Sequence, residues 1–319
     1  TDTLLKSVAS DHLAQALLFT GPRGVGKTTC ARILARMINE DGDQSKGNDF
    51  AFNIFELDAA SNNSVDDVRS LVDQVRFAPQ NGKYKVYIID EVHMLSQSAF
   101  NAFLKTLEEP PAHTIFILAT TEKHKIIPTI LSRCQIYDFK RISVPDIVEQ
   151  LRHVASLEGI TAEETALHTI AEKADGALRD ALSIFDRMAT SGAGEVTYAQ
   201  VLANLSILDH DYYFKVIELA RQGDAAGLLL LFNDILEKGF DGHIFLNGLA
   251  AHIRDLLVAG DPATSGLLEK SEEVRKRYNE QAGLITAAQC FKSIEQLAEA
   301  DARFKSSSNQ RLLVELSLL

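Results

Sequence analysis

Short apolar runs and amphipathic segments alternate along the first 140 residues of the chain. The apolar runs predict buried strands, and the segments between them carry apolar residues at helical spacing. Strands are expected at 16–20, 53–57, 85–89, 114–119 and 135–139, with helices at about 28–39, 64–76, 96–109 and 125–132. This alternation predicts an α/β fold, with a five-stranded parallel sheet covered by helices on both faces.

After residue 140 the strand signal disappears and helical patterns fill the chain. These patterns are broken near Gly159, at Asp175-Gly176 and at 191–194, and they resume after about 206, for example at 212–221, 225–238 and 287–304. We therefore expect three domains: an α/β domain at 1–141, a small helical domain at 142–205 and an all-α domain at 206–319.

Charge and composition narrow the class of protein. The 319 residues carry a net charge of −12, which argues against a generic electrostatic DNA binder. No apolar run approaches the ~20 residues of a membrane-crossing helix, and no signal peptide is recognisable, so we expect a cytoplasmic protein without a membrane partner. Cys30, Cys134 and Cys290 are too far apart for a disulfide framework or a zinc site. The chain starts without Met inside an apparent helix, which suggests a fragment.

The segment GPRGVGKT at 21–28 joins the first predicted strand to the first predicted helix. This is the pattern of a phosphate-binding P-loop, in which glycines let backbone N–H groups turn toward an anion at a helix N-terminus. Lys27 is expected to reach the β- and γ-phosphates, and the Thr28 hydroxyl to bind Mg²⁺. The predicted phosphate-binding residues are Gly21, Pro22, Arg23, Gly24, Val25, Gly26, Lys27, Thr28 and Thr29.

The third predicted strand ends in two carboxylates, Asp90 and Glu91, in the form of a Walker B element. Asp90 would hold Mg²⁺ directly or through water. Glu91 is placed to polarise a water for attack on the γ-phosphorus. The alternative is a strand that merely ends in two solvated acids, but the upstream P-loop favours ATP hydrolysis.

With these motifs in place, further segments resemble the AAA+ clamp-loader ATPases, and among them the tau/gamma family of bacterial DNA polymerase III. The segments are ELDAAS at 56–61, DEVHMLS at 90–96, FNAFLKTLEEPP at 100–111, ILSRC at 130–134, YDF at 137–139 and GALRDAL at 176–182. The resemblance is dense over 12–186 and weaker over 206–319. It implies an AAA+ nucleotide-binding domain, a helical lid and a helical collar that joins subunits.

The resemblance also assigns roles to three single residues. Thr121 corresponds to sensor 1, the polar group beside the γ-phosphate. Arg133 corresponds to the arginine finger, which acts in trans on ATP held by a neighbouring subunit and stabilises charge on the transferring phosphoryl group. Arg179 corresponds to the sensor 2 arginine, which joins the lid to the nucleotide. Without the resemblance, both arginines would be read as surface ion-pair partners.

The chain departs from the family pattern at two places. The family usually carries a four-Cys zinc module between the P-loop helix and the second strand, but 38–52 contains no Cys. Either this member lacks the module or its residues are absent from this sequence, and we predict no zinc in this chain. Most of the N-terminal stretch that contacts adenine is absent, which leaves base recognition unassigned. Family DNA contacts come from helix N-termini, so the amides of Asn62, Asn63 and Ser64 could meet a DNA phosphate. Simple capping of the helix by Ser61 or Ser64 is the alternative.

Taken together, the motifs and the resemblance imply an ATP-driven motor subunit of the replicative clamp loader, with ATP and Mg²⁺ as cofactors. Its expected partners are the other clamp-loader subunits in a hetero-oligomeric, pentameric ring, the sliding clamp, primer–template DNA and DNA polymerase. A DNA-translocating AAA+ helicase motor and a non-hydrolysing scaffold subunit stay open as alternatives. The intact P-loop and Walker B residues argue against a scaffold that hydrolyses no ATP. The Ser-Arg-Cys motif favours the clamp loader over the helicase motor.

Overall fold

The computed structural model describes residues 2–9, 13–39, 53–79, 82–268 and 270–319. Contacts between residues divide the chain into two compact units. The first comprises 1–143 with 175–180, and the second comprises 144–174 with 181–319.

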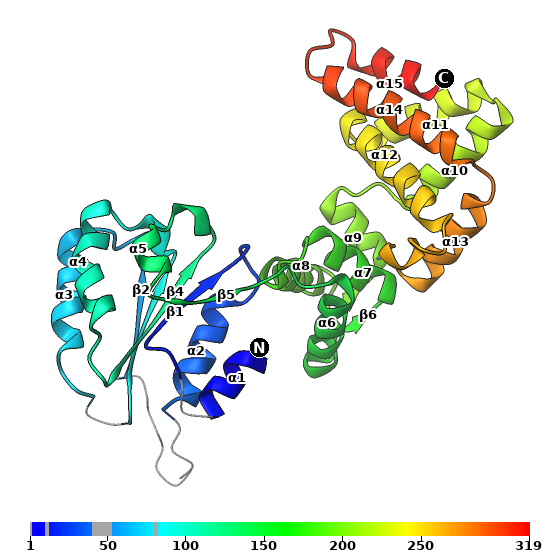
Figure 1. The fold of residues 1–319 in the computed structure, drawn as a ribbon. Helices are drawn as coiled ribbons and strands as arrows, with labels where there is room; N and C mark the ends of the chain where they lie inside the picture. The colour runs from blue at the N-terminus through cyan, green and yellow to red at the C-terminus, as the bar shows by residue number, and fades with distance from the viewer. Residues whose placement is uncertain (1, 10–12, 40–52, 80–81, 269) are drawn as a thin grey trace. The chain divides into compact units, whose positions relative to one another are not determined.

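A five-stranded parallel sheet forms the centre of the first unit (Figure 1), with the strand order β2-β3-β4-β1-β5. Its strands are β1 (Ala16–Thr20), β2 (Ile54–Asp58), β3 (Lys85–Asp90), β4 (Thr114–Thr120) and β5 (Gln135–Asp138). Every residue of β1 and β4 is buried, which is why these strands, apart from threonines at their ends, appear as continuous apolar runs in the sequence. All five predicted strands are confirmed, with ends that differ by at most one residue.

Helices cover both faces of this sheet. They are α1 (Asp2–Ala9), α2 (Lys27–Met37), α3 (Val65–Val75), α4 (Gln97–Glu108) and α5 (Pro128–Leu131), with 3₁₀ turns η2 (Val92–Met94) and η3 (Lys123–Lys125). One apolar cluster joins α2 to one face of the sheet, and a second joins α3, α4 and α5 to the other face. The layered α/β prediction is therefore confirmed.

The predicted helix at 125–132 is wrong in its first half. The structure has the turn η3, then an extended Ile127 with ψ of 142°, and the helix α5 starts only at Pro128. The ring of a proline disfavours helical backbone at the preceding residue and suits the first helical position, so the helix cannot begin earlier.

The second unit is almost entirely helical. Its helices are α6 (Val144–Glu158), α7 (Glu164–Lys173), most of α8 (Leu178–Ser191), α9 (Tyr198–Leu205), α10 (His210–Gln222), α11 (Ala225–Glu237), α12 (Gly242–Ala259), η4 (Ser265–Leu267), α13 (Glu272–Ala282), α14 (Ala287–Phe304) and α15 (Gln310–Leu318). One buried cluster is shared by α10 to α15. None of the helices in the described ranges is both long and apolar enough to cross a bilayer.

The expectation that no strand follows residue 140 is wrong for two short strands. β6 (Thr161–Ala162) and β7 (Glu195–Val196) pair in parallel within the second unit. Two-residue strands are too short to produce a period-2 pattern, so their pairing depends on the packing of the helices around them.

Candidate active site

The loop between β1 and α2 contains two glycines at positions where a side chain would strain the backbone and meet neighbouring atoms. Gly21 and Gly24 have φ values of 144° and 76°, a backbone region that favours glycine. A Cβ atom on Gly21 would lie 2.2 Å from the carbonyl oxygen of Phe139, and one on Gly24 would lie 2.9 Å from the Cβ of Ala177. The sequence therefore forces the tight loop turn that an anion-binding cradle requires.

Lys27 starts α2, and its ammonium group folds back onto this loop. Its Nζ donates to the carbonyl oxygens of Gly21 at 2.8 Å and Pro22 at 2.7 Å. Only 6% of the residue is exposed. Burial lowers the pKa of the Lys27 ammonium, although the charges of Glu91 and Asp90 oppose this effect. A buried cation held by neutral carbonyls gains a stronger partner when a phosphate enters the loop.

Thr28 and Asp90 meet at the carboxyl end of the sheet, where ligands bind in open α/β folds. The Thr28 hydroxyl donates to Oδ2 of Asp90 at 2.7 Å, while Oδ1 of Asp90 accepts from the backbone N–H of Glu91 at 2.9 Å. A hydroxyl and a carboxylate side by side are hard oxygen donors, the ligands that Mg²⁺ prefers beside phosphate oxygens. The donor set at this edge therefore fits a magnesium ion.

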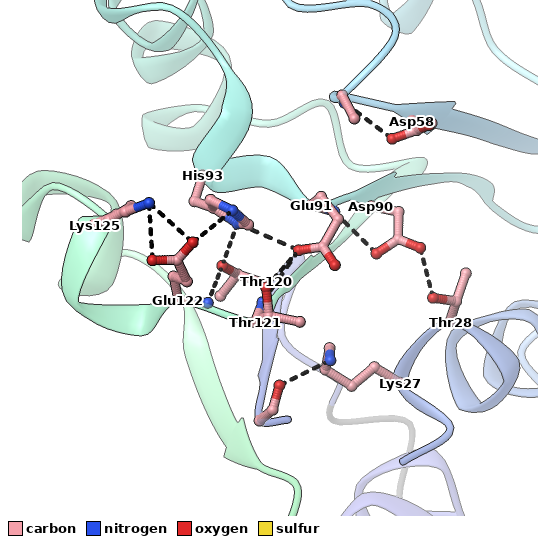
Figure 2. A network of polar contacts seen from close by, with 12 residues as sticks. Lys27, Thr28, Asp58, Asp90, Glu91, His93, Thr120, Thr121, Glu122 and Lys125 are labelled. Atoms are coloured by element: carbon pink, nitrogen blue, oxygen red, sulfur yellow. Dashed lines mark hydrogen bonds and ion pairs between the residues drawn. The ribbon is translucent and has the colours of Figure 1, made fainter. Parts of the chain in front are cut away.

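Glu91 and Thr121 are in direct contact although 30 positions separate them (Figure 2). Oε2 of Glu91 accepts from the backbone N–H of Thr121 at 3.2 Å and from its hydroxyl at 3.0 Å. Glu91 has φ of 46°, the left-handed region that is uncommon for a residue with a side chain. Such backbone outliers concentrate at functional sites. The structure thus brings the expected water-polarising residue and the expected sensor together.

Three further residues of this network were not among the predicted site residues. His93 places Nδ1 3.0 Å from the Thr120 hydroxyl and 3.3 Å from Oε2 of Glu91, and its Nε2 lies 3.4 Å from Oε1 of Glu122. Thr120 and Glu122 flank Thr121, and His93 follows Glu91 by two positions. A lone histidine in a short turn carries no spacing signal, so only the fold reveals this arrangement.

The two arginines with expected roles lie at different places in the first unit. Arg133, just after α5, donates to Glu108 at 2.6 Å and to the Thr129 carbonyl at 2.6 Å. The backbone N–H of Arg179 donates to the Gly24 carbonyl at 3.2 Å, which holds the start of α8 against the P-loop. The trans role of Arg133 stays a prediction.

The residues expected at the DNA are engaged in local hydrogen bonds. Ser64 caps α3, because its hydroxyl accepts from the Asp67 N–H and the Asp67 carboxylate accepts from the Ser64 N–H. Asn62 donates to the Asp58 carbonyl at 3.1 Å, and the Asn63 carbonyl accepts from the Ser96 N–H at 3.3 Å. Capping therefore occurs, and the DNA contact stays a prediction. Most of the segment on which the zinc prediction rests, 40–52, lies outside the described residues.

Known protein families and curated relatives match this chain along its whole length. Residues 1–143 match the family model described as "DNA polymerase III, delta subunit". Residues 146–194 match "DNA polymerase III clamp loader subunit, ATPase lid domain", and residues 196–319 match "DNA polymerase III subunits gamma and tau domain III". Subunit tau of Bacillus subtilis is 38% identical over 100% of this chain and 59% of its own length. Subunit tau of Escherichia coli is 39% identical over 86% of this chain and 45% of its own length.

A shorter relative is covered more completely. Subunit gamma of Buchnera aphidicola is 38% identical over 79% of this chain and 70% of its own length. The chain therefore spans about half the length of the curated tau relatives that it matches, and more than two thirds of the length of this gamma subunit.

Solved structures support the fold. The RuvB Holliday junction branch migration motor of Thermotoga maritima matches with a TM-score of 0.51 and 21% identity, over 68% of this chain and 71% of that one. A variant of the same motor matches over 89% of this chain and 85% of its own, also with a TM-score of 0.51. The fold is an α/β AAA+ domain followed by helical domains.

Proposed function

Since this chain belongs to the gamma/tau subunit family of bacterial DNA polymerase III, we propose that it is an ATP-hydrolysing motor subunit of the clamp loader. One observation carries the proposal. Lys27 in its closed loop, the Thr28–Asp90 pair and the Glu91–Thr121 contact converge at one edge of the sheet. A subunit that served only as a scaffold would have no use for this set of groups.

Binding of ATP would use the first two of these groups. The loop from Gly21 to Thr29 would receive the phosphates, with Lys27 as its buried cation, and Arg179 would approach from the start of α8. Thr28 and Asp90 would hold Mg²⁺, which when bound neutralises phosphate charge. Loop amides and a helix N-terminus suit an anion of this kind.

Hydrolysis would use the third group together with a neighbouring subunit. Glu91 orients a water and accepts its proton as the water attacks the γ-phosphorus, while the bond from this phosphorus to the bridging oxygen breaks and ADP leaves. Thr121 holds the Glu91 carboxylate and would lie beside the terminal phosphate. Arg133 of the adjacent subunit would stabilise the charge that develops on the transferring phosphoryl group.

The proposal extends to the assembly. ATP binding would order a hetero-oligomeric pentamer in the bacterial cytoplasm that opens the sliding clamp at primer–template DNA, and hydrolysis would release the clamp for DNA polymerase. The domains would divide at 1–141, 142–205 and 206–319, with the last as the collar. Asn62, Asn63 and Ser64 remain the proposed DNA contacts.

The ATPase rate of the full-length subunit tests this function. We expect a low rate for the subunit alone and strong stimulation when the other loader subunits, the sliding clamp and primed DNA are all present, with clamp appearing on the DNA. An activity unaffected by the clamp but raised by branched duplex DNA would instead support a helicase motor. Assembly without any hydrolysis would support the scaffold.

The trans role of Arg133 gives a second expected result. Arg133→Ala should leave the Kd for ATP within about twofold, because the residue acts on the neighbour's nucleotide, and should slow hydrolysis in the assembled ring by ~10³-fold or more at the adjacent site. The measurement is single-turnover hydrolysis by the complete complex. Arg152→Ala is the matched control, since Arg152 is also an exposed arginine paired with one glutamate, at 2.5 Å. Unchanged hydrolysis by the Arg133→Ala ring would show that the finger is another residue.

A further inference from the structure

His93 lies inside the polar network at the carboxyl edge of the sheet, between the ends of β3 and β4 (Figure 2). Only 6% of its side chain is exposed. Its Nδ1 faces Oε2 of Glu91 at 3.3 Å and the Thr120 hydroxyl at 3.0 Å, and its Nε2 faces Oε1 of Glu122 at 3.4 Å. Nδ1 is therefore hydrogen-bonded to Thr120, and each ring nitrogen lies within ion-pair distance of one carboxylate, that of Glu91 or Glu122.

The ring is anchored on the side away from Glu91. Glu122 accepts from Lys125 at 2.9 Å, and this hydrogen bond lowers the pKa of the Glu122 carboxyl, which keeps it ionised. The backbone N–H of Glu122 also donates to the Thr120 hydroxyl at 3.0 Å. A proton on Nδ1 of His93 would be donated to Thr120 and lie 3.3 Å from Glu91, measured from the nitrogen, and a proton on Nε2 would lie on the side of Glu122. Each neutral tautomer of the ring thus keeps its N–H on the side of a carboxylate.

The Glu91 carboxylate depends on such contacts for its orientation. Its backbone is in the left-handed region, and all contacts that the described residues make to this carboxylate go to Oε2, from Thr121 and His93. The other oxygen, Oε1, has no hydrogen bond or ion pair with the described residues, so a water can approach it. A carboxylate that is held through one oxygen can accept a proton at the other from a water within hydrogen-bond reach.

We propose that His93 is a positioning residue that fixes the Glu91 carboxylate through Oε2, so that Oε1 faces the attacking water. The inference rests on the proposed ATP hydrolysis at this site and adds a residue to it. His93 itself transfers no proton to or from the reacting atoms. Its replacement should therefore lower kcat and leave the affinity for ATP unchanged, because Lys27 and the loop bind the phosphates.

The test compares three variants of the full-length subunit, alone and in the complete clamp loader. His93→Ala should lower kcat by roughly 10- to 100-fold, the loss expected when a reacting group is poorly placed, with the Kd for ATP within about twofold. His93→Gln should recover most of that loss, since its amide can still donate to Glu91 and accept from Thr120. His113→Ala is the control, because His113 is another partly buried histidine of this unit, and its Nε2 is hydrogen-bonded to the Val75 carbonyl at 3.1 Å. It should leave kcat unchanged.

A double variant shows whether His93 acts through Glu91. His93→Ala in a Glu91→Gln background should cause little further loss of kcat, since residues that work as a unit are not additive. Equal losses of kcat in the His93→Ala and His113→Ala variants, or a full additional loss in the Glu91→Gln background, would overturn the positioning role. If the wild-type subunit hydrolyses no ATP in the complete complex, the proposed function fails instead. Wild-type hydrolysis with a fully active His93→Ala variant overturns this inference alone.

Discussion

Replacing Glu91 by Gln should lower ATP hydrolysis by ~10³-fold, within the range that a general base contributes. The amide keeps the shape of the side chain, and its oxygen can still accept from the backbone N–H and hydroxyl of Thr121, as Oε2 of Glu91 does. It cannot accept a proton from the attacking water. The chemical step should therefore be lost while the P-loop, with Lys27 and Thr28, still binds the nucleotide.

Single-turnover hydrolysis and the Kd for a fluorescent ATP analogue separate these two effects. Glu56→Gln is the matched control, because Glu56 is a carboxylate of the same sheet whose ion pair with Arg32, at 2.6 Å, lies on the surface. Exposed pairs of this kind contribute ~1 kcal/mol or less to stability, so activity should be retained. Normal hydrolysis by a folded Glu91→Gln variant would place the base elsewhere.

Replacing Lys27 by Ala should abolish ATP binding, with a Kd at least about 100-fold higher, which corresponds to the loss of about 2.7 kcal/mol of binding free energy. The variant loses the buried cation of the loop. It also leaves the carbonyl oxygens of Gly21 and Pro22, which accept from Lys27 at 2.8 and 2.7 Å, without their donor. Two carbonyl dipoles would then face the phosphates in place of an ammonium group.

Thermal unfolding measures this loss directly, because a ligand that binds only the folded state raises the Tm. Mg-ATP should raise the Tm of the wild-type subunit and of Lys85→Ala, and should not raise that of Lys27→Ala. Lys85 is a suitable control, since its ammonium also donates to a backbone carbonyl of the same unit, that of Gln74 at 3.4 Å. An unchanged ATP response in Lys27→Ala would remove this lysine from the binding site.

The sequence by itself determined the architecture of the first unit and the positions of its motifs. The run at Ala16–Thr20, apolar except for its last residue, becomes β1 without a change of boundary, because a strand buried on both faces is built mainly from apolar residues. The glycines of the loop at 21–28 and the carboxylates after Lys85–Ile89 are also local signals. They follow from the backbone freedom of glycine and from the end of an apolar strand, which a window of a few residues contains.

Only the tertiary structure decided which side chains meet. Glu91 and Thr121 come into contact because β3 and β4 are neighbours in the sheet, so their carboxyl ends lie side by side. The same pairing encloses His93 between Glu91 and Glu122, and the packing of the helical unit pairs β6 with β7 across 34 positions. Hydrophobic periodicity records whether a residue is buried, but the partner of a buried polar group depends on strand order and packing between distant segments.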